Sequence, residues 1–229
     1  MIGVLGGMGP AATADFFLKL TAATPAARDQ EHRHVIVWSD PTVPDRSDAL
    51  IGLAPDPTPW LVRGANALRD AGATIVAIPC NTAHAFVPRL VKETGIDIVH
   101  MIDEVAQTLA RQRPAIRTVG LLATTGTVAT HLYQEWLVSH GIDVIVPDEA
   151  AQEENVMRGI RAIKAGAYTA EDRRRLLSVA DDLLARGARA VIAGCTEIPL
   201  GIRDTDLPVP LVDPTQVLAE AVVRQTVRV

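Results

Sequence analysis

The chain has 229 residues, a formal net charge of −5, 48% hydrophobic residues and 21% charged residues, a composition ordinary for a soluble globular protein. This length allows one large domain or two small ones, each able to bury a hydrophobic core. The acidic balance argues against a nucleic-acid surface, which needs clustered Lys and Arg. The longest apolar runs, such as 74–79, are far too short to span a membrane, and the first residues show no secretory signal pattern. The sequence therefore predicts a cytoplasmic protein that binds neither nucleic acid nor membrane.

Short apolar or β-branched runs alternate with longer amphipathic stretches along the chain. The runs predict buried strands at residues 2–5, 35–38, 75–78, 119–122, 144–146 and 191–193. The amphipathic stretches predict helices at residues 11–22, 59–71, 83–94, 103–112, 130–140, 149–165 and 170–186. Segment 40–59 carries five prolines and is predicted to be a long ordered loop. The alternation predicts an α/β protein with parallel sheets flanked by helices.

Two features of the first half of the chain recur in the second half, in the same order. Segment 3–9 aligns with 120–126 at an offset of 117, and segment 78–82 aligns with 193–197 at an offset of 115. The repetition predicts two similar α/β domains related by a pseudo-twofold, the first over residues 1–114 and the second over 115–213. A C-terminal helix at 214–229 is expected to pack back on the first domain.

The two cysteines occupy matching places in this repeat. Cys80 follows the strand predicted at 75–78, Cys195 follows the strand predicted at 191–193, and a turn into a helix comes next in both cases. In open α/β sheets, ligands bind at the carboxyl ends of the strands, where both cysteines are predicted to lie. The free amides and partial positive charge at the start of the following helix are expected to ease formation of a thiolate. An arbitrary cysteine is most often a small buried hydrophobe. The repeated placement favours a chemical role instead, with both residues as free thiols in a reducing compartment.

Two like thiols on facing halves suit the inversion of an α-carbon. Racemisation removes a proton from one face and returns one to the other, which needs a thiolate and a thiol that exchange roles with direction. The resulting carbanion has to be stabilised by charge and hydrogen bonds at the substrate carboxylate. Candidates are the backbone amides of the turns at 6–9 and 124–127 and the guanidinium of Arg46. We expect the two sulfurs to face one another across an interdomain cleft.

The motifs around these residues closely resemble those of the aspartate/glutamate racemase family, and within it the aspartate racemase branch. The matching segments are 3–10, 12–13, 44–46, 79–84, 120–127, 163–164 and 194–199. The two cysteine motifs together are highly specific, whereas each glycine motif alone is weak. Glutamate racemases typically carry Cys-Thr-His at the second cysteine, so Glu197 after Cys195-Thr196 favours the aspartate branch.

The resemblance implies two Rossmann-like domains with the active site in a cleft between them, no cofactor and a homodimer. No metal is expected, because neither the cysteines nor the histidines have metal-ligand spacing. It implies an amino-acid substrate, most directly aspartate, with Cys80 and Cys195 as the proton-transfer pair. Arg46, Asn81, Thr82 and Lys164 are implied to bind the substrate, and for Lys164 this match alone argues against a solvated surface lysine. The predicted substrate-binding set is completed by Met8, Gly9, Thr124, Gly126, Thr127, Thr196 and Glu197.

Other functions stay open at this point. One is a broad-specificity or glutamate racemase, or a related isomerase or lyase of dicarboxylates on the same scaffold. A second is a non-catalytic module that clamps an anion, and a third is a thiol redox protein with a reversible disulfide. A nucleotide site near Asp40 is disfavoured because the turn at 3–9 departs from the G-x-G-x-x-G pattern. His84 could tune Cys80, although a surface or capping role is equally compatible with its position.

Overall fold

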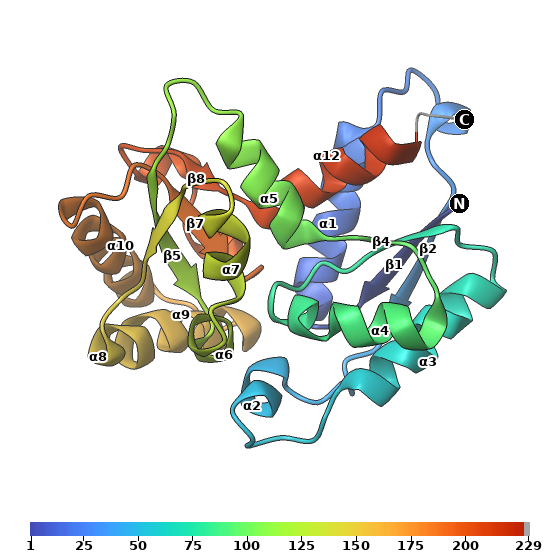
Figure 1. Cartoon of the computed structure of the whole chain (residues 1–229), viewed down its shortest axis with the longest axis horizontal. Helices are drawn as coiled ribbons and strands as arrows, with labels where there is room; N and C mark the ends of the chain where they lie inside the picture. The colour runs from blue at the N-terminus through green and yellow to red at the C-terminus, as the bar shows by residue number, and fades with distance from the viewer. Residues whose placement is uncertain (227–229) are drawn as a thin grey trace. The chain divides into compact units, whose positions relative to one another are not determined.

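The computed structural model describes residues 1–226, which form two compact units. The first unit comprises Met1–Glu104 together with the chain from Thr215 onward, and the second comprises Val105–Pro214. Each unit has its own four-stranded parallel sheet flanked by helices (Figure 1), which confirms the predicted fold class. The division between the units falls inside helix α5 (Met101–Ala110). The boundary expected between residues 114 and 115 remains a prediction.

The first sheet has the strand order β2-β1-β3-β4. Its strands are β1 (Ile2–Gly6), β2 (Val35–Ser39), β3 (Ile75–Ala77) and β4 (Ile98–Val99). The helices of this unit, besides the first turn of α5, are α1 (Pro10–Ala23), α2 (Arg46–Leu50), α3 (Thr58–Asp70), α4 (Val87–Thr94) and α12 (Pro214–Thr226), with 3-10 turns at Asp29–Glu31 and Thr82–Phe86. Proline at the first position of α1 fits a helix start, because that residue needs no amide donor.

The second sheet has the strand order β6-β5-β7-β8. Its strands are β5 (Thr118–Ala123), β6 (Asp143–Ile145), β7 (Val191–Gly194) and β8 (Leu211–Val212). Its helices are α6 (Thr125–Ala129), α7 (Leu132–Val138), α8 (Glu149–Ala151), α9 (Arg158–Lys164), α10 (Ala170–Ala185) and α11 (Ile198–Gly201), with a π-helical turn at Gln152–Met157 and a 3-10 turn at Asp204–Asp206. A capping box formed by Thr169 and Asp172 fixes the start of α10.

The two units repeat one another in detail. Subtracting four from each strand number converts the second strand order into the first. A Cβ on Gly3 in β1 would lie 3.3 Å from Leu68 of α3, and a Cβ on Gly120 in β5 would lie 3.0 Å from Leu183 of α10. Each glycine therefore allows a helix to pack closely on the first strand of its sheet, at matching places in the repeat.

The faces of the first sheet are covered by different helices. One hydrophobic cluster joins the sheet to α3 and α4, and another joins it to α1 and α12. Leu218 and Val222 of α12 belong to the same cluster as Phe16 and Leu20 of α1, and Figure 1 shows the red α12 beside the blue α1. The last three residues of the helix predicted at 214–229 lie outside the described residues.

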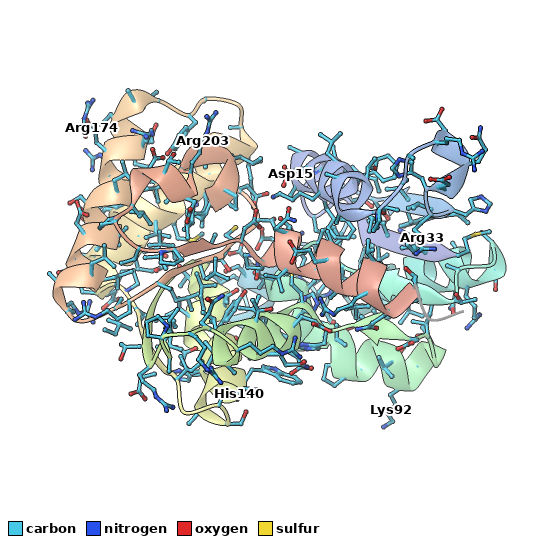
Figure 2. The ribbon with its side chains drawn as sticks, turned by 90° about the horizontal axis from the view of Figure 1, so that it is seen from above. Asp15, Arg33, Lys92, His140, Arg174 and Arg203 are labelled. Carbon is cyan, nitrogen blue, oxygen red and sulfur yellow. The ribbon has the colours of Figure 1, made fainter. Side chains whose placement is uncertain are left out.

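Charged side chains lie on the outside of both units. In Figure 2, Lys92 of α4 and Arg174 of α10 extend away from the ribbon of their own unit, and both are exposed. Among the helices of residues 1–226, none combines the length and hydrophobicity that crossing a membrane would require.

The structure corrects several predicted elements. The loop expected at 40–59 contains helix α2, and the helix expected at 83–94 is a 3-10 turn followed by α4. The helix expected at 149–165 contains a π-helical turn between α8 and α9. Strands β4 and β8 were not predicted because two residues are too few to show a period, and their parallel pairing with a central strand defines them.

Candidate active site

Cys80 lies just after strand β3, at the carboxyl edge of the first sheet. Its amide donates a hydrogen bond to the carbonyl of Ile78 over 2.8 Å, so the backbone turns sharply there. The thiol is free and the residue is 5% exposed. Its sulfur has no hydrogen-bond partner among residues 1–226. Asn81 and Thr82, which follow it, are buried as well.

His84 lies in the 3-10 turn after Cys80 and is hydrogen-bonded to the backbone rather than to the thiol. Its Nδ1 is 2.9 Å from the carbonyl oxygen of Cys80, and its Nε2 accepts from the amide of Met101 over 3.1 Å. Burial, helped by the neighbouring His100, lowers the pKa of His84 to about 3. The ring is therefore neutral at ordinary pH, and the structure corrects the surface position that the sequence left open.

Arg46 is the first residue of α2, and backbone carbonyls hold its guanidinium. Nη1 donates to the carbonyls of Val43 and Pro44 over 3.2 and 3.1 Å, and Nη2 donates to that of Met8 over 3.2 Å. The residue is only 9% exposed, and its Nε has no hydrogen-bond partner. No carboxylate within the described part of the chain pairs with Arg46. Because a buried cation is costly without an anion, this position suits a negatively charged ligand.

The glycine-rich turn between β1 and α1 lies next to this guanidinium. The amide of Gly7 donates to Thr13 Oγ1 over 2.8 Å, and the Thr13 hydroxyl donates to the carbonyl of Gly9 over 2.9 Å. Gly7 has a φ of +91°, and a Cβ there would lie 2.3 Å from the amide nitrogen of Asp40, so no side chain fits. The amides of Met8 and Gly9 find no acceptor within residues 1–226, which makes them candidate donors to an anion.

Cys195 takes the corresponding place after strand β7 in the second unit. Its Sγ donates a hydrogen bond to Glu197 Oε2 over 3.0 Å, and the Thr196 hydroxyl donates to the same oxygen over 3.2 Å. All three residues are buried. Burial and the adjacent Glu197 carboxylate raise the pKa of the Cys195 thiol well above its usual value.

The prediction that the edge of the sheet eases thiolate formation is therefore wrong for Cys195. Helix α11, which follows, spans only Ile198–Gly201, so its N-terminus contributes little. The Glu197 carboxylate is in direct contact with the sulfur, and a like charge at that distance disfavours the thiolate. Cys195 is thus held as a protonated thiol at neutral pH.

One further group acts on the pKa of Cys195, and Cys195 in turn acts on the pKa of a buried tyrosine. Lys164, the last residue of α9, lowers the pKa of the thiol through its positive charge, as a smaller effect than burial and Glu197. Tyr133 of α7 is fully buried, and its pKa is raised by burial and, to a smaller extent, by the electrostatic influence of Asp213 and Cys195. The sequence identified Lys164 but not Tyr133, because no local pattern links a tyrosine to a cysteine so far along the chain.

The turn at 124–127 has fewer groups available than the glycine turn of the first unit. Thr124 caps α6, and its hydroxyl lies 3.0 Å from that of Thr127. The amide of Thr125 donates to Met157 Sδ over 3.4 Å. Gly126 and Thr127 are buried and also make hydrogen bonds or electrostatic contacts within the chain. An anion would therefore find more open donors at Met8 and Gly9 than here.

The structure gathers the predicted site residues into two groups, one in each unit. In the first unit Met8 and Cys80 share a hydrophobic cluster, and α2, which begins with Arg46, contacts the 3-10 turn after Cys80. In the second unit Cys195 contacts Glu197 and responds to the charge of Lys164. Within the described residues, no cluster of three or more His, Cys, Asp or Glu side chains could hold a metal ion.

Comparison with known proteins covers nearly the whole chain. A profile of the family described as Asp/Glu/Hydantoin racemase matches residues 5–222. Among curated proteins, the broad specificity amino-acid racemase RacX of Bacillus subtilis (strain 168) is 27% identical over 227 residues, which are 97% of this chain and 96% of that protein.

Solved structures give the same result. The Picrophilus torridus aspartate racemase has a TM-score of 0.87 at 30% identity, over 98% of this chain and 93% of that one. Glutamate racemase of Francisella tularensis subsp. tularensis SCHU S4, solved with D-glutamate, has a TM-score of 0.74 over 99% of this chain and 80% of that one, and at 17% identity it shows a shared fold alone. The chain therefore belongs to the Asp/Glu/hydantoin racemase family and is an isomerase.

Proposed function

We propose that this enzyme interconverts the L and D enantiomers of aspartate by two-base proton transfer, with Cys80 and Cys195 as the two bases. The observation that carries the proposal is the recurrence of a buried free thiol at the same place in two repeated sheets. Family membership and the likeness to an aspartate racemase of known structure support it. The proposal requires both thiols to reach opposite faces of one substrate.

In one direction, Cys80 as thiolate removes the α-proton, and the Cys195 thiol donates its proton to the opposite face. The new C–H bond leaves Cys195 as the thiolate and Cys80 as the thiol, so the roles are exchanged for the reverse direction. The hydrogen bond from Cys195 to Glu197 and the raised pKa of Cys195 support its assignment as the proton donor of the resting enzyme. Under this assignment Cys80 carries the base function in the resting state.

The negative charge that develops during proton removal spreads onto the substrate carboxylate. The proposed stabilising groups are the buried guanidinium of Arg46 and the amides of Met8 and Gly9, which all lie around one turn of the first unit. In the second unit, the ammonium of Lys164 is the proposed group that stabilises negative charge on the substrate. An acidic amino acid has two carboxylates and therefore offers an anionic partner for each of these two cations, which favours it as the substrate.

A broader substrate range is the second candidate. It is favoured by the similarity over almost the full length to a protein described as a broad specificity amino-acid racemase. The anion sites of the two candidates differ, because a broad enzyme needs a cation only for the α-carboxylate. The choice between them is therefore made by the substrate panel below.

The test is to incubate purified enzyme with L-aspartate, without added cofactor, and to measure D-aspartate by chiral chromatography. L-Glutamate and L-alanine are assayed in parallel, and Cys80→Ser and Cys195→Ser serve as inactive controls. We expect D-aspartate to form fastest and both controls to lose racemisation. Comparable rates on all three substrates would replace the aspartate assignment with broad specificity, and absence of any inversion would reject the racemase mechanism. The homodimer and the cytoplasmic location also remain predictions, the first of them testable by light scattering.

A further inference from the structure

The carbonyl group of Cys80 is held by a buried, neutral histidine. A carbonyl can only accept a hydrogen bond and an amide N–H can only donate one. The contacts of Nδ1 with Cys80 O and of Nε2 with the Met101 amide are therefore both satisfied only by the neutral tautomer with its proton on Nδ1. His84 is 1% exposed, and the ring of His100 packs edge-on against it with centroids 4.9 Å apart. The imidazole is thus fixed in orientation as well as in protonation.

We propose that His84 is a positioning residue for Cys80. It links the Cys80 backbone to the first turn of helix α5 and affects proton transfer by Cys80 but not by Cys195. The inference rests on the proposed function. Its basis is the set of contacts around the Cys80 backbone, whose amide is bound to Ile78 and whose carbonyl is bound to His84. Since no described residue bonds to the sulfur itself, the backbone determines where the thiol points.

The first turn of α5, to which His84 is hydrogen-bonded, makes further hydrogen bonds. Met101 is the first residue of α5, and His84 satisfies one of the amides that the start of a helix leaves without an intrahelical partner. Glu104, in the same first turn, accepts hydrogen bonds from Arg224 and Gln225 of α12 over 2.6 and 3.0 Å. His84 therefore connects Cys80 to the start of α5, which is also hydrogen-bonded to α12.

The second unit has no counterpart of this link. At the offset that relates Cys80 to Cys195, His84 corresponds to Pro199, whose side chain offers no hydrogen-bonding group. Cys195 instead bonds through its sulfur to Glu197. A change at His84 should therefore disturb one thiol and spare the other.

The experiment uses two single-cysteine backgrounds. Cys195→Ser keeps only Cys80 and Cys80→Ser keeps only Cys195, and each is assayed by NMR for loss of the α-proton of each enantiomer of aspartate in heavy water. His84→Gln is then added to both. A glutamine amide can reach the Met101 amide but not the Cys80 carbonyl, whereas the shorter asparagine of His84→Asn can keep the bond to Cys80. The exposed His34→Gln is the matched control.

We expect His84→Gln to lower Cys80-dependent exchange by about tenfold or more, because small displacements of a reacting group are costly, and to leave Cys195-dependent exchange unchanged. His84→Asn should lose less, and His34→Gln should change neither. Equal losses in both backgrounds, or no loss in either, would overturn the inference. If His84→Gln fails to fold, His84→Ala, which also removes the bond to Cys80, is judged by the same comparison. Absence of enantiomer-selective exchange in the two backgrounds before His84 is changed would count against the proposed function instead.

Discussion

The first and second units have the same strand order but differ in the groups that surround the cysteine. Thr13 Oγ1 donates to the Gly9 carbonyl over 2.9 Å in the first unit, and Thr130 Oγ1 donates to the Gly126 carbonyl over 2.8 Å at the matching place in the second. The turn after the first strand therefore has the same threonine-to-glycine hydrogen bond in both units. The difference is that His84 is bonded to the backbone of one cysteine, whereas a carboxylate is bonded to the sulfur of the other.

This difference indicates how a repeated scaffold can hold two like thiols in unlike states. Position 82 is Thr and the corresponding position 197 is Glu, so a single change beside the cysteine brings a buried negative charge to one sulfur only. A neighbouring negative charge favours the protonated thiol. Racemisation starts from one protonated and one ionised thiol, so this asymmetry suits the direction in which Cys80 removes the proton, whereas the reverse direction requires Cys195 as the thiolate.

The largest expected effect comes from removing either thiol. Cys80→Ser and Cys195→Ser should each lower racemisation at least about 10³-fold, because each direction needs both groups and a serine hydroxyl is a far weaker acid. Each variant should still exchange the α-proton of one enantiomer with solvent, and the preferred enantiomer should differ between them. NMR in heavy water measures this. A shared preference, or racemisation near the wild-type rate in either variant, would show that the two thiols are not complementary bases.

The next largest effect concerns the cation of the first unit. Arg46→Lys keeps the charge but cannot reproduce the three bonds to carbonyls together with an interaction with substrate. We expect about 2–4 kcal/mol of lost transition-state stabilisation, or about 1.5 to 3 decades in kcat/KM on aspartate.

Arg63→Lys is the control for this change. Arg63 is an exposed arginine paired with Asp40 over 2.8 Å, and its replacement should leave kcat/KM nearly unchanged. Equal activity of the Arg46→Lys and Arg63→Lys enzymes would remove Arg46 from the site.

The next effect concerns Glu197, the carboxylate that is hydrogen-bonded to Cys195. Glu197→Gln removes the negative charge beside Cys195 but keeps a hydrogen-bond acceptor there, so the pKa of the thiol should fall. The measurement is the rate of iodoacetamide alkylation against pH in the Cys80→Ser background, where Cys195 is the remaining thiol. The midpoint should move to lower pH with Gln at position 197. An unchanged or higher midpoint would show that burial alone keeps Cys195 protonated.

The sequence predicted the features that depend on local pattern. The position of each cysteine after a buried strand, the glycine turn and the repeat follow from short motifs and their spacing. The bond from Cys195 to Glu197 was not predicted, and Glu197 was instead assigned to the substrate, because rotamers and burial decide where a carboxylate points. The contact between His84 and Met101 joins residues on separate elements, so only the folded chain reveals it.

The smallest expected effect is on stability, and it follows from His84. Its pKa is lowered to about 3 in the folded protein and is about 6.5 in an unfolded chain. Between these values the unfolded chain binds more protons, so the free energy of unfolding falls as pH decreases from about 6.5 towards 3 and is unaffected by His84 above that range.

The slope from this one group is at most about 1.4 kcal/mol per pH unit and is half of that at pH 6.5, which gives about 1.6 kcal/mol between pH 6.5 and 5. His84→Gln has no titrating group at this position, so its stability should depend less steeply on pH by that amount, although it is less stable at neutral pH. Urea unfolding at several pH values measures both slopes, with exposed His34→Gln as the control. His100 also has a lowered pKa because of burial, so some slope should persist in the variant. Parallel curves for the wild type and His84→Gln would mean that His84 is not held neutral by the fold, and the link between Cys80 and α5 would lose its basis.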